Sequence, residues 1–353
     1  MDHVTFHPGP PTEEGDPTSD LQTFLKLLQT YADDYYALRG GQKANYEDIY
    51  YLAQQIRDDE QGRIVNPAIL GFLNDIEAGT RELSARIPRI DDDHSSFQNM
   101  VMGACTLAQC VVEKKISTPN QIKGLELLRA LASSPDIDRI DICTLNHDTL
   151  IERFLKDSTG KEVTNGFAQA LGKSTVGRFD PRLFETSAKV RIFKLHGSID
   201  WFMFADAESV FCGIPTNGNP DQCLNERAEP LHNVFGGPVF LAGTYNKIIN
   251  YGFGVIAEMH FWFHKLLKEY DTIVMCGYGW NDFGVNMRLS EWFTSRAKTR
   301  LCLMHERPEE VAQNPRSLMQ RIYNDLVATR RLILIKKWME DVSIQELIGS
   351  LNG

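Results

Sequence analysis

The chain of 353 residues is acidic, with a formal net charge of −10, and 42% of its residues are hydrophobic. The negative balance argues against broad contact with nucleic-acid phosphates, so we expect no direct nucleic-acid binding. No apolar run is long enough for a transmembrane helix, and the first twenty residues lack a secretory signal. Seven cysteines without a CxxC pair indicate reduced thiols, which predicts a cytoplasmic protein without disulfides or a cysteine zinc site.

The first part of the chain is predicted to be helical. Residues 1–20 are rich in Pro, Gly, Asp and Glu, which is typical of a flexible terminus. Residues 21–137 form a helical region packed on the core, and helical spacing gives its first segment one apolar face, made of Leu21, Phe24, Leu25, Leu28 and Tyr31. Its tyrosine-rich helices ADDYYAL and NYEDIYYL serve either as a subunit or partner interface or as local core.

Short β-rich runs alternate with helical segments in residues 138–353. The predicted strands cover 139–146, 189–197, 238–243, 271–279, 300–305 and 331–337. The predicted helices lie near 148–156, 253–269, 283–297, 309–328 and 343–351. This alternation, with near-continuous apolar strands, predicts an α/β fold with a Rossmann-like, doubly wound, mostly parallel sheet. Two less regular stretches, 157–188 and 204–237, are expected to be surface insertions.

Polar or glycine residues follow four of the predicted strands. They are Asn146 and Asp148, then His196, then Gly277, Tyr278 and Gly279, and finally His305 and Glu306. Because ligands of such sheets bind beyond the carboxyl ends of the strands, the sequence predicts a functional site there. Two of the acidic side chains also suit structural roles, since Asp282 would cap the helix near Phe283 and Asp148 the helix beginning at Thr149.

Two histidines at helical spacing, His260 and His264, are candidates for a metal site. A structural or catalytic zinc needs at least three protein ligands, and no third ligand stands near them in the sequence. We therefore expect no metal and interpret the pair as ordinary helix histidines.

Four motifs together resemble the sirtuin-like NAD-consuming domain of bacterial antiphage defence systems. TLNHDTLIE, FKLHGSIDW, GTYNK and VMCGYGWNDFGVN occur in the order and spacing of that family over roughly residues 139–345. The family pattern runs Thr-Thr-Asn-Tyr-Asp, then Leu-His-Gly, then Gly-Tyr-Ser-x-x-Asp with a later Asn. CLMHERP and KKWMEDVSIQEL also resemble the family's adenosine-contacting strand and its closing strand and helix.

The resemblance implies roles for individual residues. Asn146 would hold a water near the anomeric carbon of the ribose, Asp148 would contact the nicotinamide ribose side, and His196 would be the general base. The implied cofactor-binding residues, which lie beneath and beside the adenosine part, are Gly277, Tyr278, Gly279, His305 and Glu306. Asp282 and Asn286 also match family positions, and we expect structural roles for them.

Two departures from the family stand out. The family opens with a strand and a Gly-Ala-Gly-x-Ser phosphate loop, which is not found in the first residues. Either that segment lies outside this sequence, or the cradle is built otherwise, or the domain is a degenerate binder. The paired CxxC zinc module of deacylating sirtuins is also absent, which favours cleavage of NAD+ by water over deacylation.

The resemblance therefore implies an NAD+ hydrolase that serves as an antiphage effector and takes NAD+ as its substrate. The family commonly controls this activity through homo-oligomers and a partner, here a HerA-like hexameric ATPase or a short Argonaute. The alternative is a non-catalytic module that senses NAD+ or ADP-ribose and regulates a partner ATPase or nuclease.

Overall fold

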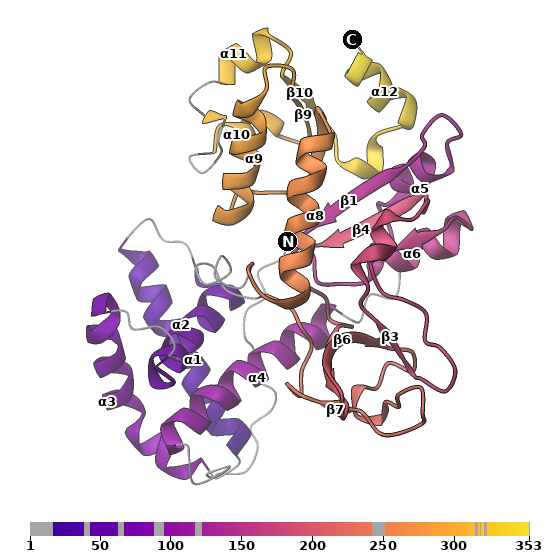
Figure 1. Cartoon of the computed structure of the whole chain (residues 1–353). Coiled ribbons are helices and arrows are strands. Elements are labelled where there is room, and N and C mark those ends of the chain that lie inside the picture. Colours follow the sequence, from indigo (N-terminus) through magenta and orange to yellow (C-terminus); the bar gives the residue numbers. More distant parts are fainter. Residues whose placement is uncertain are drawn as a thin grey trace. The chain divides into compact units, whose positions relative to one another are not determined.

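The fold is described from a computed structural model of the chain (Figure 1). The structure describes residues 17–38, 43–62, 67–87, 95–116, 122–241, 251–314, 317, 319–320 and 323–352. The chain divides into two compact units, whose described parts lie within residues 17–115 and 116–352. Helix α5 (Glu126–Ser133) belongs to the second unit, because its Ala132 is buried in one cluster with Leu155 and Val190.

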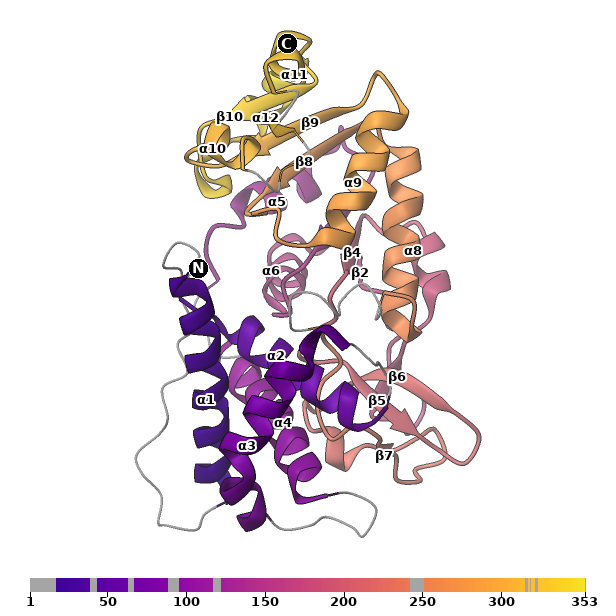
Figure 2. The same cartoon turned by 90° about the vertical axis from the view of Figure 1, so that its left-hand side faces the viewer.

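The first unit is helical (Figure 2). Its elements are α1 (Pro17–Ala37), α2 (Tyr46–Glu60), η1 (Pro67–Ile69), α3 (Leu70–Arg86) and α4 (Ser96–Ile116). Helix α1 begins inside the stretch predicted to be flexible, and residues 1–16 lie outside the described residues. The predicted apolar face of α1 is confirmed at Phe24, Leu25 and Leu28, which are fully buried. Tyr31 is instead 39% exposed, with its ring 4.8 Å from that of Phe72 on α3.

The second unit confirms the predicted α/β class with parallel strands. One sheet has the order β1-β4-β2, formed by β1 (Ile140–Thr144), β4 (Val190–Lys194) and β2 (Val163–Thr164). The other has the order β10-β9-β8, formed by β8 (Thr272–Cys276), β9 (Arg300–Met304) and β10 (Leu332–Ile335). Every strand pair in these two sheets is parallel, so the polar residues that follow the strands lie at their carboxyl ends.

Helices cover both faces of the two parallel sheets. They are α5, α6 (Leu150–Thr159), α8 (Gly254–Glu269), α9 (Phe283–Ser295), α10 (Pro308–Ala312), α11 (Tyr323–Ala328) and α12 (Ile344–Asn352). Side chains of α8 form one buried cluster with Phe193 of β4 and with Leu301 and Leu303 of β9. Helix α5 packs against β9 through Leu127 and against β4 through Ala132. Helices α5 and α8 therefore join the sheets, one on each face. Helix α8 also runs beside α9 (Figure 2).

The two sheets nevertheless remain separate. No described strand pairs with β1 on the side away from β4, or with β8 on the side away from β9. The hydroxyl of Tyr270, just before β8, donates to the carboxylate of Asp141 in β1, and so a side chain links the two strands near their beginnings. Among the described residues, no strand pairs with both β1 and β8.

Two predicted segments were wrong. Residues 238–241 form only an isolated antiparallel bridge between Phe240 and Gly197, and residues 242–243 lie outside the described residues. The predicted helix 309–328 is interrupted, because α10 ends at Ala312 and α11 begins at Tyr323.

The two stretches expected to be irregular insertions contribute to an antiparallel sheet with the order β3-β6-β5-β7. Its strands are β3 (Val176–Arg178), β6 (Val210–Pro215), β5 (Phe202–Ala205) and β7 (His232–Asn233). The one-turn helices η2 (Pro181–Glu185) and η3 (Pro220–Gln222) lie in the same stretches, and η5 (Met339–Asp341) precedes α12. Within the described ranges, no helix is both long and apolar enough to span a bilayer.

Candidate functional site

The ends of β1 and β4 lie side by side. The backbone N–H of Leu195 donates to the carbonyl oxygen of Thr144 over 2.9 Å, one residue before His196. Asn146 is exposed just beyond this point, where its own N–H donates to Thr144 Oγ1 over 3.1 Å. The first two of the predicted strand ends therefore meet at one edge.

Asp148 contributes to the start of α6. Its Oδ1 accepts the N–H of Leu150 over 3.0 Å, and its carbonyl oxygen accepts a hydrogen bond from the buried Lys194 ammonium group. These contacts give Asp148 a helix-start role like the one that the sequence raised. They are compatible with a further contact to a ligand, since the side chain is only half-buried.

His196 is held by a carboxylate and a phenol. Its Nε2 lies 2.9 Å from Asp282 Oδ2 and 3.0 Å from Tyr251 Oη, and the Tyr251 hydroxyl donates to the same Asp282 oxygen over 2.5 Å. Because the carboxylate can only accept, these distances favour a proton on Nε2 of His196. The imidazole, 3% exposed, is thus fixed in orientation and tautomer. We call His196, Tyr251 and Asp282 the His196 network.

Asp282 also caps α9, as the sequence predicted. Its second oxygen, Oδ1, accepts the N–H of Val285 over 2.8 Å. Burial alone would raise the pKa of this carboxyl group, but the hydrogen bonds from His196, Tyr251 and Val285, together with the positive charge of a protonated His196, lower its pKa well below the ordinary range. Asp282 is therefore a carboxylate at neutral pH, and it offers a fixed negative charge to the imidazole.

A second histidine, His260, packs against Tyr251 of the His196 network. The ring of His260 stacks on Tyr251 with centroids 3.7 Å apart, and its Nε2 lies 3.0 Å from the carbonyl oxygen of Leu195. Burial, and then the positive charge of His196, lower the pKa of His260 to about 4. His260 is therefore neutral at pH 7 and donates from Nε2 to the carbonyl. This contact orients the Tyr251 ring and the end of β4 together.

His260 and His264 have different surroundings although they share α8. His264 Nδ1 lies 3.4 Å from Arg288 Nη1, whereas His260 contacts Tyr251 and Leu195. Across the described ranges, no group of three or more His, Cys, Asp or Glu residues could hold a metal ion.

Lys194, the last residue of β4, forms a buried ion pair with Glu152 of α6. Its Nζ lies 3.2 Å from Glu152 Oε1. Burial raises the pKa of Glu152 by more than the Lys194 charge lowers it. The pair joins the last residue of β4 to α6 and so fixes the position of the β1 and β4 ends relative to each other.

The glycine that follows His196 is required by close packing. Gly197 has φ +79°, and a Cβ there would lie 2.2 Å from the carbonyl oxygen of Val239. Residues 239–241 cross at this point, where Leu241 N–H donates to the carbonyl oxygen of His196 over 2.7 Å. The His-Gly pair therefore lets a neighbouring backbone segment pack directly against the chain just after β4.

The turn after β8 is the third predicted strand end. Gly277 adopts φ +70°, and a Cβ there would meet nothing within 4 Å, so its glycine is favoured by conformation and leaves open space beside the backbone. The Tyr278 hydroxyl is bonded within the turn, to the Asp282 carbonyl oxygen over 3.0 Å and to Asn286 Oδ1 over 2.7 Å. Tyr278 and Asn286 thus stabilise the turn, while Gly277 and Gly279 line its backbone.

Strained backbone occurs within the same turn. Trp280 is a non-glycine residue with φ +61° and is 1% exposed. Its carbonyl oxygen accepts Asn286 Nδ2 over 2.9 Å. A left-handed conformation costs about 1–2 kcal/mol for such a residue. Burial of the indole and the Asn286 bond hold it in place, two residues before Asp282.

The fourth predicted strand end has other partners. The ring of His305 meets that of Trp338 edge-on at 4.3 Å, and its Nδ1 accepts the N–H of Arg307 over 2.9 Å. Glu306 is exposed. Neither residue has a described contact with the His196 network. His305 and Glu306 remain predictions for the adenosine side.

Sequence reasoning missed Tyr251, His260 and Lys194 as parts of the site. Tyr251 follows residues 242–250, which lie outside the described residues, and carries no motif of its own. His260 was noticed only for its spacing to His264. The buried charge of Lys194, at the end of an apolar strand, was a signal available in the sequence, because lysine is almost never fully buried unless it is paired.

No protein-family model matches the chain, and no curated protein matches its sequence. The family resemblance therefore depends on the quoted motifs and on what the site geometry adds to them.

Proposed function

We propose that the chain is an NAD+ glycohydrolase, which cleaves NAD+ to nicotinamide and ADP-ribose and serves as the effector of an antiphage system. The observation that carries the proposal is the His196 imidazole, held by Asp282 and Tyr251 at the edge where Asn146 follows β1. A base positioned by a carboxylate, at a strand edge that also carries an exposed carboxamide, suits activation of a water or of a ribose hydroxyl.

The proposed reaction breaks the bond between the ribose C1′ and the nicotinamide nitrogen. The electron pair of that bond stays with nicotinamide, which leaves as a neutral molecule, so no strong general acid is needed. Water adds to C1′ and loses a proton, either directly to His196 or through a ribose hydroxyl. Asn146 holds this water, and Asp148 contacts the ribose. Asp282 stabilises the positive charge on the imidazole after it has taken the proton.

The direct test is release of nicotinamide from NAD+ by the purified chain. His196→Ala should lower turnover by about 10²-fold or more, because general-base catalysis contributes about 10²–10⁴ in rate. Asn146→Ala should be similarly severe. His232→Ala is the matched control, since His232 is an exposed histidine on β7 and lies outside the network. Full turnover by His196→Ala would overturn the proposal.

A second function is favoured by one observation. No strand that the structure describes pairs with both β1 and β8, so none of these strands carries a phosphate loop beside the site. A non-catalytic module that binds NAD+ or ADP-ribose and regulates a partner ATPase or nuclease would need less exact placement of the ribose. Tight binding of ADP-ribose without nicotinamide release, with and without the partner, would select this second function.

We further propose that the activity is controlled by assembly, because unregulated NAD+ cleavage would harm the host. The proposed form is a homo-oligomer with a HerA-like hexameric ATPase or a short Argonaute as its partner. Co-expression with the neighbouring gene product, followed by a measurement of mass and NAD+ cleavage, would test this assembly.

A further inference from the structure

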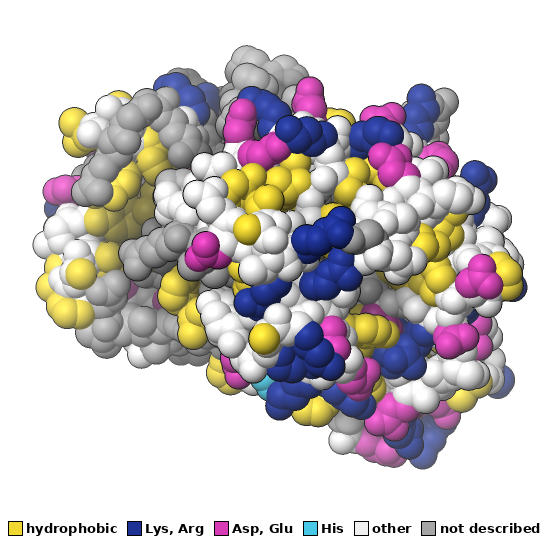
Figure 3. All heavy atoms as spheres, turned by 90° about the horizontal axis from the view of Figure 1, so that it is seen from above, with side chains coloured by type: hydrophobic (Ala, Val, Ile, Leu, Met, Phe, Trp, Pro, Cys, Tyr) yellow, Lys and Arg dark blue, Asp and Glu magenta, His cyan; other side chains and the backbone are white. Residues whose placement is uncertain are grey.

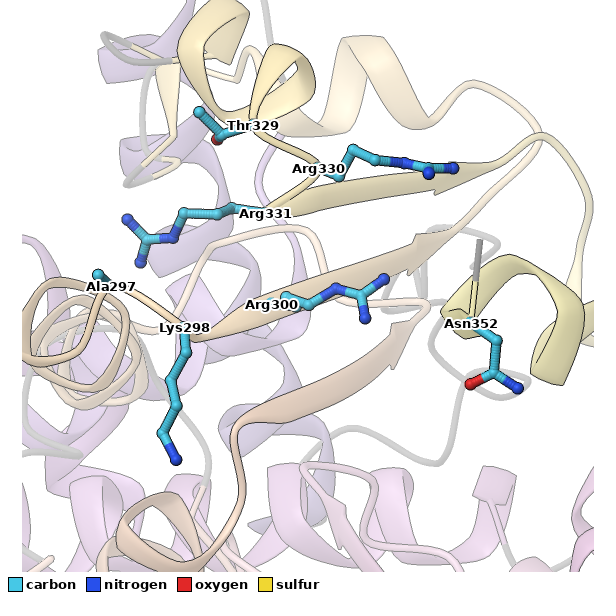
Figure 4. A pocket seen from close by; sticks show the side chains of 7 residues that line it. All are labelled: Ala297, Lys298, Arg300, Thr329, Arg330, Arg331 and Asn352. Atoms are coloured by element: carbon cyan, nitrogen blue, oxygen red, sulfur yellow. The ribbon is translucent and has the colours of Figure 1, made fainter.

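A hollow with cationic residues in its lining lies where β9 and β10 begin (Figure 4). Gly277 and His305 follow the other ends of β8 and β9. Its volume is about 360 Å³. We propose that it binds a small phosphate-bearing anion of the pyrophosphate type. This site is independent of the proposed NAD+ cleavage, because it lies at the opposite ends of the strands.

The lining carries four positive charges and no carboxylate. The cations are Lys298, Arg300, Arg330 and Arg331. Lys298 Nζ does pair with Asp271 Oδ2 over 2.6 Å, but the other oxygen of Asp271 is 2.9 Å from Arg296 Nη1. One carboxylate is thus shared by two cations. Neither Arg300 nor Arg330 forms an ion pair with a residue that the structure describes, so positive charge remains at the wall of the hollow.

One of the four cations has a structural explanation. Arg331 donates to the carbonyl oxygens of Phe293, Arg296 and Thr299 at the end of α9, and its guanidinium lies 4.2 Å from the Phe293 ring centroid. A cation at a helix C-terminus complements the helix dipole. These carbonyl groups fix Arg331 firmly but do not cancel its charge, and they do not account for Arg300 or Arg330.

The backbone at Arg330 turns the chain from α11 into β10. Arg330 has φ +57°, and this left-handed residue ends the helix as in a Schellman turn, because its N–H donates to the carbonyl oxygen of Val327 and the N–H of Arg331 to that of Leu326. In Figure 4, the side chains of Arg300 and Arg330 extend in the same direction along the strands, and Asn352 of α12 lies on that side. An anion bound on that side would reduce the mutual repulsion of these two like charges.

The size and the overall charge favour a small anion over a nucleic acid. The chain as a whole is strongly acidic, which repels a long polyanion beyond the immediate patch. Seen from above, Lys and Arg side chains lie among Asp and Glu side chains on the surface (Figure 3). A compact ligand that fits within the hollow needs no extended basic surface.

Calorimetric titration of the whole chain with pyrophosphate tests the proposal. We expect saturable binding that weakens as salt is added. The double variant Arg300→Gln/Arg330→Asn should weaken binding at least about tenfold, because it removes two charge-assisted hydrogen-bond donors. Asparagine tolerates the left-handed backbone, so this variant removes the side-chain charges with little effect on the fold. Its NAD+ cleavage should equal that of the unmodified chain.

Arg227→Gln is the matched control, since Arg227 is an exposed arginine paired with Glu208 far from β9 and β10 in the sequence. It should leave pyrophosphate binding unchanged. The proposal is overturned if the unmodified chain shows no saturable binding, or if the double variant binds as tightly. It is also overturned if a single-stranded oligonucleotide or a poly-glutamate peptide binds through these arginines while pyrophosphate does not.

Discussion

Neighbouring strands of the second unit differ in how far protein covers them. Every residue of β4 is buried, whereas no residue of its partner β1 is, and Cys143 is exposed directly beside the fully buried Phe193. The other sheet repeats the contrast. Val274 of β8 is 39% exposed beside the fully buried Cys302 of β9.

The contrast shows what holds the two parallel sheets together. In one continuous sheet, interior strands would be the most buried. Here the exposed strands β1 and β8 are each an edge strand of a three-stranded sheet, and the buried strands β4 and β9 are the central ones. The sheets are joined instead by α5 and α8, by the Tyr270 to Asp141 bond, and by the His196 network at the opposite end. Side chains and helices thus replace backbone pairing between the described strands.

The largest expected difference is in the free energy of unfolding, between substitutions at two paired residues of β4 and β1. Phe193→Ala should lower the free energy of unfolding by about 3–5 kcal/mol, because it leaves a cavity among Phe184, Trp262 and their neighbours. Cys143→Ala, at the paired position of β1, should change it by less than about 0.5 kcal/mol, as exposed substitutions usually do. The shift of the urea midpoint of the second unit measures both. Equal losses would mean that β1 is as well covered as β4.

Thiol labelling of the native chain is the next most sensitive test. Cys143 and Cys276 lie on the exposed edges, and Cys302 is fully buried. The edge thiols should react with N-ethylmaleimide at least about 10²-fold faster than Cys302, which reacts only after unfolding. The labelling rates should rise with pH, because the thiolate is the reactive form.

Cys110, exposed on α4 of the first unit, is the internal reference for this experiment. Labelling of individual residues is measured by mass spectrometry after digestion. Protection of Cys143 and Cys276 equal to that of Cys302 would contradict the open edges.

The sequence predicted the α/β class because period and composition report burial locally. Leu301, Cys302, Leu303 and Met304 form an apolar run that only a strand covered on both faces requires, and this strand is β9. The capping role of Asp282 was equally local, since it needs only the turn that precedes α9. Such features depend on neighbours within a few residues, and sequence patterns record them.

The missed features depend on distant neighbours. The strands β3, β6, β5 and β7 are two to six residues long and are stabilised by pairing across the insertions, so their sequences carry little alternation. Tyr251 reaches the site only because α8 begins next to it and stacks His260 on its ring. Hydrophobic periodicity also does not predict that β1 and β8 are edge strands, because the apolar residues of an edge strand resemble those of a buried strand.

The smallest expected effect concerns the polar link between the sheets and tests whether it serves chemistry. Asp282→Asn preserves the helix cap, because asparagine caps as well as aspartate, but removes the charge beside His196. NAD+ cleavage should fall about tenfold or more, since the imidazolium loses its carboxylate. The acid limb of the pH profile should move to lower pH, because an imidazole without that carboxylate gives up its proton more readily. Asp271→Asn, the same change just before β8, should leave the limb in place. A stability loss in Asp282→Asn without any movement of the limb would mean that the link only joins the two sheets.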